Sequence, residues 1–483
     1  MAAVLTLTCP LSLFRQALQA LVRAPHAGVI LSMGHRSDQY GTEWLARNPT
    51  TADAVTALRR HDHRLVVGLG EEMRSSDTLK SIVARADRLL DGSSPEHGAS
   101  IETARSAILD RPSGHVVRGA GFGYLVLPTT DSPAEASGFL RIDGRESAIE
   151  ELRLVGPGMY RVPLGASARA RAAHLALPFR APSEEHWSRT IRALGGVATW
   201  QRLTHLRAVI VGCGRTGSLV AAHLRRVGLQ DLTLVDPDRV EHHNCGEMDL
   251  IDQTDVDRPK AEAVARRLSL IESPVVSRVL ALPVPVDRRE AMAALKRADV
   301  IICCADSDAA RLTTAIAATV YHKVLLDIGT GIMGSEAAAS TRHMESAAPA
   351  RDGDRSAAPG NVTPRTMGAD VRLVIPGDGC LLCRGNLTNY SQAVHDLASH
   401  RTTTAVRGRQ ANLRLGSLRS LNQLAVGVGT RMIEDLVSER LATTTWARVD
   451  NGEDGRLTVS YPAIAASPEC DLCLRAGLGD DAF

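Results

Sequence analysis

A glycine-rich turn between an apolar strand and a helix constrains the fold of this chain more than any other feature. Residues 208–211 form an apolar run, residues 212–217 read Gly-Cys-Gly-Arg-Thr-Gly, and residues 218–227 have helical periodicity. In such a strand–turn–helix unit, glycines let the backbone turn tightly and approach a phosphate, which binds at the helix N-terminus. We therefore predict a nucleotide site whose phosphate-binding residues are Gly212, Gly214 and Gly217.

A second strand, residues 232–236, follows the helix and ends in Asp236. An acid at this position of a βαβ unit accepts hydrogen bonds from ribose hydroxyls. The alternative is a sheet of the same kind with no nucleotide bound.

Strand and helix patterns continue to alternate beyond this unit. Helical patterns at 260–270 and 309–321 alternate with strands at 300–303 and 324–327. This alternation predicts the α/β class, with a Rossmann-like, doubly wound and mostly parallel sheet. Further along the chain we expect a strand at 371–375, a long helix at 415–436 and a strand pair within 449–461.

Composition divides the chain into two predicted domains. Residues 1–180 are expected to form a separate α+β domain, with a helix at 76–90 between strands at 65–68 and 122–127. Residues 185–475 form the second predicted domain. Within it, residues 335–369 are rich in Ala, Ser, Pro, Gly and charged residues, which predicts a mobile insertion.

Four of the nine cysteines form two CxxC pairs. Two such knuckles complete a tetrahedral, structural zinc site, because four protein ligands leave no open position. The predicted ligands are Cys380, Cys383, Cys470 and Cys473. Buried thiol pairs or a redox CxxC are the alternatives. Among the other cysteines, Cys213, Cys303 and Cys304 lie in apolar runs and are expected to be small buried residues.

Bulk properties exclude several partners. The net charge is +2 and aromatic residues make up 3% of the chain, so neither nucleic acid nor a membrane surface is expected to bind. Apolar stretches fall short of the roughly 20 residues that a membrane span needs. The N-terminus lacks a basic region before its apolar run, and we predict a cytoplasmic protein.

Several elements after the glycine turn resemble, in order, those of the ThiF family of ubiquitin-activating-like adenylyltransferases. Residues 236–244 (DPDRVEHHN) resemble the family's D-x-D…N signature, and residues 258–260 (RPK) its (K/R)-x-K element. Residues 304–311 (CADSDAAR) resemble its (C/A)-x-D-(N/S)-x-x-x-R turn, and residues 188–196 its entry segment. The resemblance covers roughly residues 185–475.

The resemblance implies that ATP adenylates the C-terminal carboxylate of a small ubiquitin-like protein or peptide and that pyrophosphate leaves. It assigns catalytic roles to Arg189, Lys260 and Asp306, and nucleotide contacts to Asp238 and Asn244. Lys260 matches the cation that faces the phosphates, and Asp306 the aspartate linked to Mg²⁺. Arg189 matches a residue that reaches the neighbouring subunit's site, which implies a homodimer.

Simpler interpretations of three of these residues remain open. Lys260 and Arg189 are also typical of solvated surface charges, and Asp238 is typical of a turn acid.

Three departures from the family pattern bear on activity. Glu247 stands where the family has a phosphate-neutralising arginine, and Arg215 where a third glycine is usual. No cysteine lies between Cys383 and Cys470, so a thioester at the usual position is excluded. Cys245 is a remote alternative nucleophile. Family members of the molybdopterin-synthase type, and of the type that modifies microcin-like peptides, complete adenylation without depending on a stable thioester. The molybdopterin-synthase and thiamine-biosynthesis adenylyltransferases are closest in logic to this chain.

Two other functions compete with adenylation. A catalytically degenerate nucleotide- or protein-binding scaffold of the same fold is favoured by Glu247. A nicotinamide-dependent oxidoreductase is disfavoured, because such enzymes need neither Lys260 nor Asp306. In the N-terminal region, His61, His63, Ser76 and Asp77 resemble part of the JAMM/MPN zinc-peptidase motif, but their spacing is wrong for an active peptidase. Residues 121–164 have a β-rich pattern that fits a degenerate JAMM/MPN-like fold or a substrate clamp. Substrate recognition is the other role considered for this region.

Overall fold

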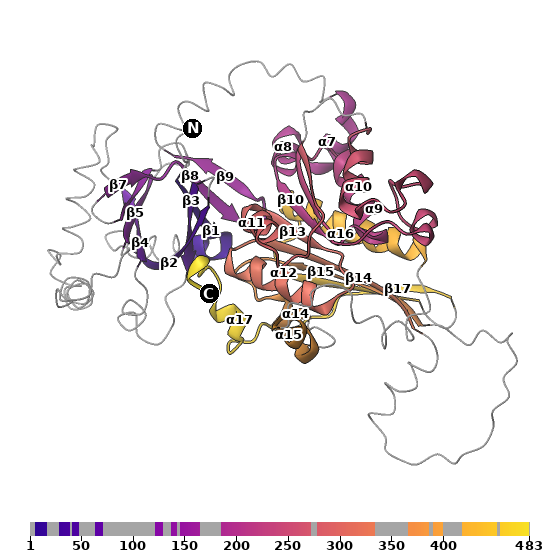
Figure 1. Cartoon of the computed structure of the whole chain (residues 1–483). Coiled ribbons are helices and arrows are strands. Elements are labelled where there is room, and N and C mark those ends of the chain that lie inside the picture. The colour runs from indigo at the N-terminus through magenta and orange to yellow at the C-terminus, as the bar shows by residue number, and fades with distance from the viewer. Residues whose placement is uncertain are drawn as a thin grey trace, which may run out of the picture. The chain divides into compact units, whose positions relative to one another are not determined.

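The computed structural model describes residues 5–16, 29–38, 41–47, 63–70, 121–128, 137–142, 145–164, 185–271, 278–333, 366–385, 390–398, 418–451 and 455–482. The chain divides into two compact units. The first unit comprises Met1–Ala181, Thr319–His322 and Asp471–Phe483, and the second comprises Pro182–Ala318 and Lys323–Cys470. Figure 1 shows the helices and strands of both units.

An eight-stranded sheet in the order β12-β11-β10-β13-β14-β15-β16-β17 forms the centre of the second unit. Its parallel strands are β10 (Arg207–Val211), β11 (Asp231–Val235), β12 (Arg278–Leu282), β13 (Val300–Cys303) and β14 (Val324–Met333). The antiparallel strands are β15 (Thr366–Val374), β16 (Thr445–Asn451) and β17 (Leu457–Ser460). The predicted Rossmann-like α/β sheet is confirmed.

Helices connect the parallel strands and cover them. They are α9 (Arg215–Arg226), α10 (Lys260–Leu268), α11 (Arg289–Arg297) and α12 (Asp308–Val320). Strand β13 is buried along its whole length, as expected for an apolar parallel strand between helical layers. The long helix α16 (Arg419–Val437) contacts α9, β14 and β15 (Figure 1).

Two tryptophans attach the entry segment of the second unit to α9. The segment forms α7 (Ser188–Leu194) and α8 (Val197–Thr204). Trp187 Nε1 donates to the carbonyl of Arg226 over 2.7 Å, and Trp200 Nε1 donates to that of Val227 over 3.1 Å. The indoles thereby satisfy carbonyls that a helix C-terminus leaves without partners.

The described strands of the first unit form a nine-stranded mixed sheet in the order β7-β6-β5-β4-β2-β3-β1-β8-β9. They are β1 (Thr6–Pro10), β2 (Val29–Asp38), β3 (Gly41–Arg47), β4 (His63–Gly70), β5 (Gly121–Pro128), β6 (Ser137–Ile142), β7 (Arg145–Ala148), β8 (Glu151–Val155) and β9 (Tyr160–Pro163). The register pairs Leu7 with Trp44 and Leu152, which belong to an apolar core.

The last residues of the chain pack within this first unit. Arg47 Nε donates to the carbonyl of Ala476 over 2.7 Å, and its NH2 group donates to that of Leu474 over 2.8 Å. Tyr321 donates its hydroxyl proton to Asp480 over 2.7 Å. The short helices α17 (Asp471–Leu474) and η4 (Asp480–Ala482) lie in this segment.

Several expectations from the sequence need correction. Residues 366–369 belong to β15, so the predicted insertion 335–369 extends too far, and its other residues lie outside the described ones. The sequence pattern did not predict β12, α11, α7 or α8. The predicted helix 76–90 and residues His61, Ser76 and Asp77 also lie outside the described residues, whereas His63 begins β4.

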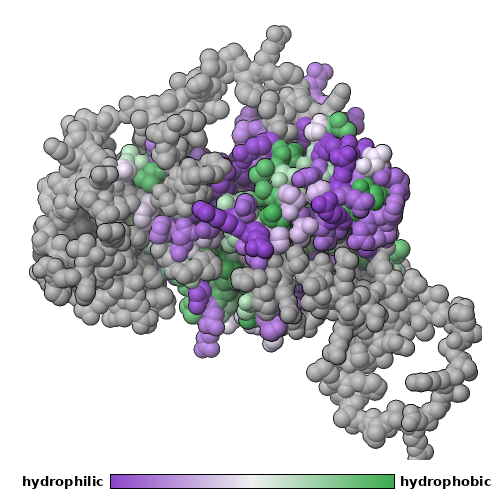
Figure 2. All heavy atoms as spheres, in the orientation of Figure 1, coloured by the Kyte–Doolittle hydropathy of each residue, from purple (hydrophilic) through white to green (hydrophobic). Residues whose placement is uncertain are grey.

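Among the described residues, no helix combines the length and apolar character needed to cross a bilayer. On the coloured surface in Figure 2, hydrophilic side chains surround smaller hydrophobic areas, as is typical of a chain that buries most of its apolar residues.

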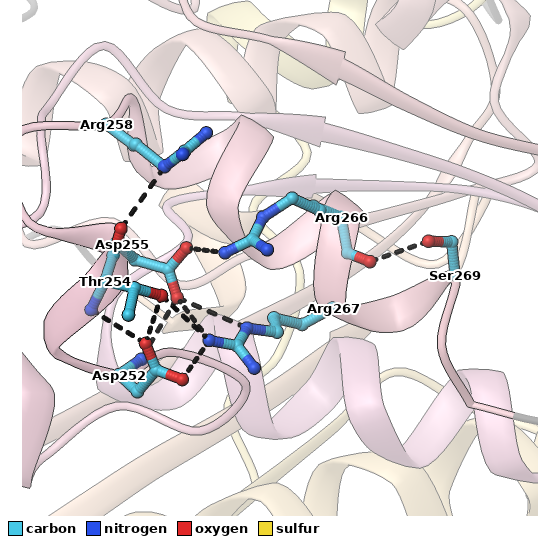
Figure 3. Close-up of polar contacts among 7 residues, drawn as sticks. All are labelled: Asp252, Thr254, Asp255, Arg258, Arg266, Arg267 and Ser269. Carbon is cyan, nitrogen blue, oxygen red and sulfur yellow. Dashed lines mark hydrogen bonds and ion pairs between the residues drawn. The ribbon is translucent and has the colours of Figure 1, made fainter.

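A cluster of charged side chains holds the segment that leads into α10 (Figure 3). Asp255, the last residue of η3 (Gln253–Asp255), is fully buried and pairs with Arg266 and Arg267 of α10. Burial alone would raise the pKa of Asp255, but these arginines and the amide of Asp252 lower it. These ion pairs therefore attach α10, whose first residue is Lys260, to the segment that precedes it.

Replacing Asp255 with Ala should destabilise the protein by about 2 kcal/mol, because the amide of Asp252 and two guanidinium groups lose a shared acceptor. Urea unfolding followed by circular dichroism would measure this change. Arg278→Ala is the control, since Arg278 is largely exposed in its pair with Asp231 and should change stability by less than about 0.5 kcal/mol. Equal effects of both substitutions would contradict the role of Asp255.

Candidate nucleotide site

The carboxyl ends of the central parallel strands meet at one edge of the second unit's sheet. Val211 at the end of β10 pairs with Val235 of β11 on one side and with Cys303 of β13 on the other. The strand order reverses at β10, since β11 and β12 lie to one side and β13 and β14 to the other. In open α/β sheets ligands bind in the crevice at such a switch point.

The three glycines of the turn lie at this switch point and differ in how much space a side chain would have at each position. A Cβ on Gly212, whose φ is +90°, would lie 2.8 Å from the amide nitrogen of Ala305 after β13. A Cβ on Gly217 would lie 1.9 Å from the carbonyl oxygen of Gly212. Gly214 is the N-cap of α9, where no side chain caps the helix and a Cβ would meet no atom within 4 Å. The turn is therefore closely packed on its inner side and open at the helix N-terminus.

Asp236 joins the glycine turn to the end of β11. Its Oδ2 accepts from the amide of Cys213 over 2.6 Å, and its Oδ1 accepts from the amide of Asp238 over 2.8 Å. Burial raises the pKa of Asp236 to about 6, although Lys260 and the two amide bonds oppose the rise. The carboxylate thus fixes the turn, a role that the sequence did not indicate.

Lys260 and Asp238 lie together across two paired segments. Lys260 Nζ donates to Asp238 Oδ2 over 3.1 Å, and the Lys260 amide donates to the Asp238 carbonyl over 2.8 Å. The Lys260 side chain is only 12% exposed. An ion-paired, mostly buried lysine does not fit the simpler interpretation of a solvated surface charge.

Asn244 and Glu247 belong to the loop after β11. Asn244 is buried in η2 (His242–Gly246), and its Oδ1 accepts from the amide of Glu241 over 2.9 Å. Glu247 Oε2 lies 2.7 Å from Nε of Arg215, the first residue of α9. Two of the three departures from the family pattern, Arg215 and Glu247, therefore form one ion pair. In the sequence, only the opposite charges of the two residues indicated that they could pair.

Asp306 and Arg311 have different surroundings, although one motif contains both. Asp306 is exposed after β13. Arg311 pairs with the fully buried Asp327, which also lies 3.0 Å from Arg372. Burial would lower the pKa of Arg311, but Asp327 raises it overall. Arg311 thus stabilises the sheet, whereas the Asp306 carboxylate is accessible.

Residues 187–402 match the ThiF family. We call these residues the ThiF-family domain, after the family that they match.

The sulfur carrier protein ThiS adenylyltransferase of Escherichia coli (strain K12) is 31% identical over 111 residues, which cover 23% of this chain and 43% of that protein. The protein of the same name from Bacillus subtilis (strain 168) is 34% identical over 119 residues, covering 24% and 35%. This chain thus spans less than half the length of these relatives. A crystal structure of E. coli MccB with ATP is 16% identical, with a TM-score of 0.43, and the match covers 64% of this chain and 81% of that one.

Arg189 lies at the start of the ThiF-family domain. It is exposed on the first turn of α7, apart from the glycine turn in sequence. A role in a second subunit's site stays a prediction.

The two CxxC pairs meet in space. The sulfur atoms of Cys380, Cys383, Cys470 and Cys473 all lie within 4.8 Å of one another. Cys380 directly precedes α14 (Leu381–Gly385), Cys383 lies within it, and α15 (Tyr390–Ala398) follows. Four converging thiols fit a tetrahedral metal ion better than two unrelated pairs.

The other described cysteines of the ThiF-family domain are buried or partly buried. Cys213 and Cys303 are fully buried, as predicted, and burial raises both pKa values. Cys304 is partly exposed, although burial of its thiol raises its pKa. Cys245 is half-buried beside Asn244.

Gly217→Ala should disrupt the ThiF-family domain, because the new Cβ would lie 1.9 Å from a backbone oxygen. Gly214→Ala is the matched control, since its Cβ has open space and its φ is −73°. Thermal unfolding should show a midpoint lower by several degrees for Gly217→Ala alone. Equal midpoints for the two variants would mean that the turn is not packed as described.

Proposed function

We propose that this protein uses ATP to adenylate the C-terminal carboxylate of a small ubiquitin-like protein or peptide. The family of residues 187–402 and the names of the similar proteins support this reaction class. The observation that carries the proposal is the gathering of an open helix N-terminus, Asp236 and Lys260 at the carboxyl ends of β10 and β11.

In the proposed reaction, a carboxylate oxygen attacks the α-phosphorus of ATP. A new P–O bond forms, the bond to the β-phosphate bridging oxygen breaks, and pyrophosphate leaves with the electron pair. Negative charge on the phosphates is balanced by the N–H groups and dipole of α9. Lys260, held by Asp238, adds a positive charge next to the turn. Gly212, Gly214 and Gly217 allow the close approach, Asp236 accepts from the ribose, and Asn244 contributes a further contact.

Two metals belong to the proposal. Mg²⁺, when bound with ATP, neutralises phosphate charge, and the exposed carboxylate of Asp306 suits such a hard cation. Zinc fits the four-cysteine cluster, where a closed ligand set makes it structural. CxxC thiols that bind a metal fit a reducing compartment, and we propose a cytoplasmic location.

The proposed assembly is a homodimer in which Arg189 acts at the partner subunit's site. The exposure of Arg189 on α7 is compatible with this role. A monomeric mass in solution would remove the proposed contribution of Arg189.

A non-catalytic scaffold of the same fold is the second candidate function, because Glu247 adds a negative charge beside the turn. ATP binding without turnover would select the scaffold. Binding of NADH in preference to ATP would instead select an oxidoreductase.

Isotope exchange between pyrophosphate and ATP tests the main proposal. With a carboxylate-terminated carrier encoded near this gene, exchange should appear, and Lys260→Ala should lower its rate by about 100-fold, as loss of one charge-stabilising donor does. Lys296→Ala, at the end of α11, is the control and should keep the rate. No exchange with any such carrier would argue against adenylation.

Nucleoside binding should weaken as the pH falls through about 6, where Asp236 takes up a proton and loses acceptor capacity. Its folded pKa exceeds the ordinary value, so its contribution to stability is present below about pH 4 and is lost as the pH rises through about 6. Adenosine is the probe, because it has ribose hydroxyls but no titrating phosphate. Equilibrium dialysis between pH 5 and 8 measures the midpoint.

Lys260→Ala should raise that midpoint, since Lys260 lowers the pKa of Asp236. Asp236→Asn should abolish the transition. Adenosine affinity that stays constant over this pH range in the natural protein would refute the role of Asp236.

Metal analysis of the purified protein should find one zinc per chain. Cys470→Ser should lower the zinc content and thermal stability, because one of four converging thiolates is lost. Cys245→Ser, outside the cluster, is the control and should retain the metal. A full complement of zinc in Cys470→Ser would exclude this site.

A further inference from the structure

The ion pair between Arg215 and Glu247 stands at the open end of the glycine turn. Arg215 is the first residue of α9, directly after the N-cap Gly214. Its Nε lies 2.7 Å from Oε2 of Glu247, and both side chains are about one-third exposed, at 34% and 37%. The pair is thus in reach of solvent and of any anion bound at the helix N-terminus.

The backbone of the loop around Glu247 is held from two sides. The amides of Glu247 and Met248 both donate to the carbonyl of Asn244, over 3.0 and 2.8 Å. The amide of Asp249 donates to the hydroxyl of Ser218, in the same first turns of α9, over 3.0 Å. These bonds hold the backbone of Glu247 beside the first turns of α9, where its carboxylate pairs with the longer Arg215 side chain.

The opposite charges of Arg215 and Glu247 determine how this pair interacts with a polyphosphate. A lone carboxylate there would repel the ligand, and a lone arginine would lose side-chain entropy on binding. A guanidinium has five N–H donors, so one carboxylate leaves donors for a second anion. Guanidinium groups also bind phosphates in a directed, bidentate way.

We propose that Arg215 binds the phosphates of ATP and that Glu247 is a positioning residue that holds Arg215 at the N-terminus of α9. This inference rests on the proposed nucleotide site. It assigns Glu247 a supporting role in that site, although its negative charge alone would repel the phosphates.

The test compares dissociation constants for ATP and for adenosine by calorimetry. Arg215→Ala should weaken ATP binding by about 10- to 100-fold, the range for a charged hydrogen bond, and change adenosine binding by less than about 2-fold. Arg215→Lys should restore part of the loss. Arg226→Ala, at the opposite end of the same helix, is the matched control and should bind both ligands normally.

Glu247 variants separate positioning from charge neutralisation. Glu247→Gln should weaken ATP binding several-fold, and the double variant Arg215→Ala/Glu247→Gln should bind ATP as weakly as Arg215→Ala. ATP affinity equal to the natural protein's in the double variant would show that Arg215 only neutralises Glu247, and would overturn the proposal. Equal losses for ATP and adenosine in Arg215→Ala would overturn it as well.

The two proposals fail in different ways. A natural protein that does not bind ATP would refute the nucleotide site and the inference together. A natural protein that binds ATP, with Arg215→Ala binding it equally well, would refute the inference alone.

Discussion

The buried carboxylate of Asp236 is the interaction on which the proposed site depends. It accepts one amide proton from the glycine turn and one from the residue that pairs with Lys260. Two loops from different strand ends are thereby fixed to a single side chain. Burial of this carboxylate raises its pKa, so the protein maintains its charge at some cost in stability. Such a cost is common where a site is organised for binding.

Around this carboxylate, positive and negative groups are arranged in pairs. Lys260 has Asp238, Arg215 has Glu247, and Arg311 has Asp327. The first two pairs lie beside the open helix N-terminus, and the third is buried in the sheet. Arg215 and Glu247 are each about one-third exposed, so this pair can exchange one partner for a ligand. Asp327 is fully buried, so its separation from Arg311 would leave a buried charge without its partner.

The sequence predicted the parts of this fold that local patterns encode. Apolar β-branched runs, such as residues 208–211 and 300–303, became buried strands of the Rossmann-like sheet. Strand β12 was missed because it lies at the sheet edge, where half-exposed residues carry no clear alternation. The Arg215–Glu247 pair was missed because the two residues are brought together by tertiary folding, which spacing along the chain does not reveal. The convergence of the four cysteines was predictable, since two CxxC pairs are typical of a four-cysteine metal site.

The first unit is discontinuous along the chain, and this has a consequence for biosynthesis. Residues 471–482 pack with strands made from the first 47 residues, through contacts such as that of Arg47 with Ala476. A ribosome must therefore translate the whole second unit before the first can acquire these contacts. Until residues 471–482 have been synthesised, part of the surface of the early strands stays exposed. During this time the nascent chain is most vulnerable to misassociation or to cellular quality control.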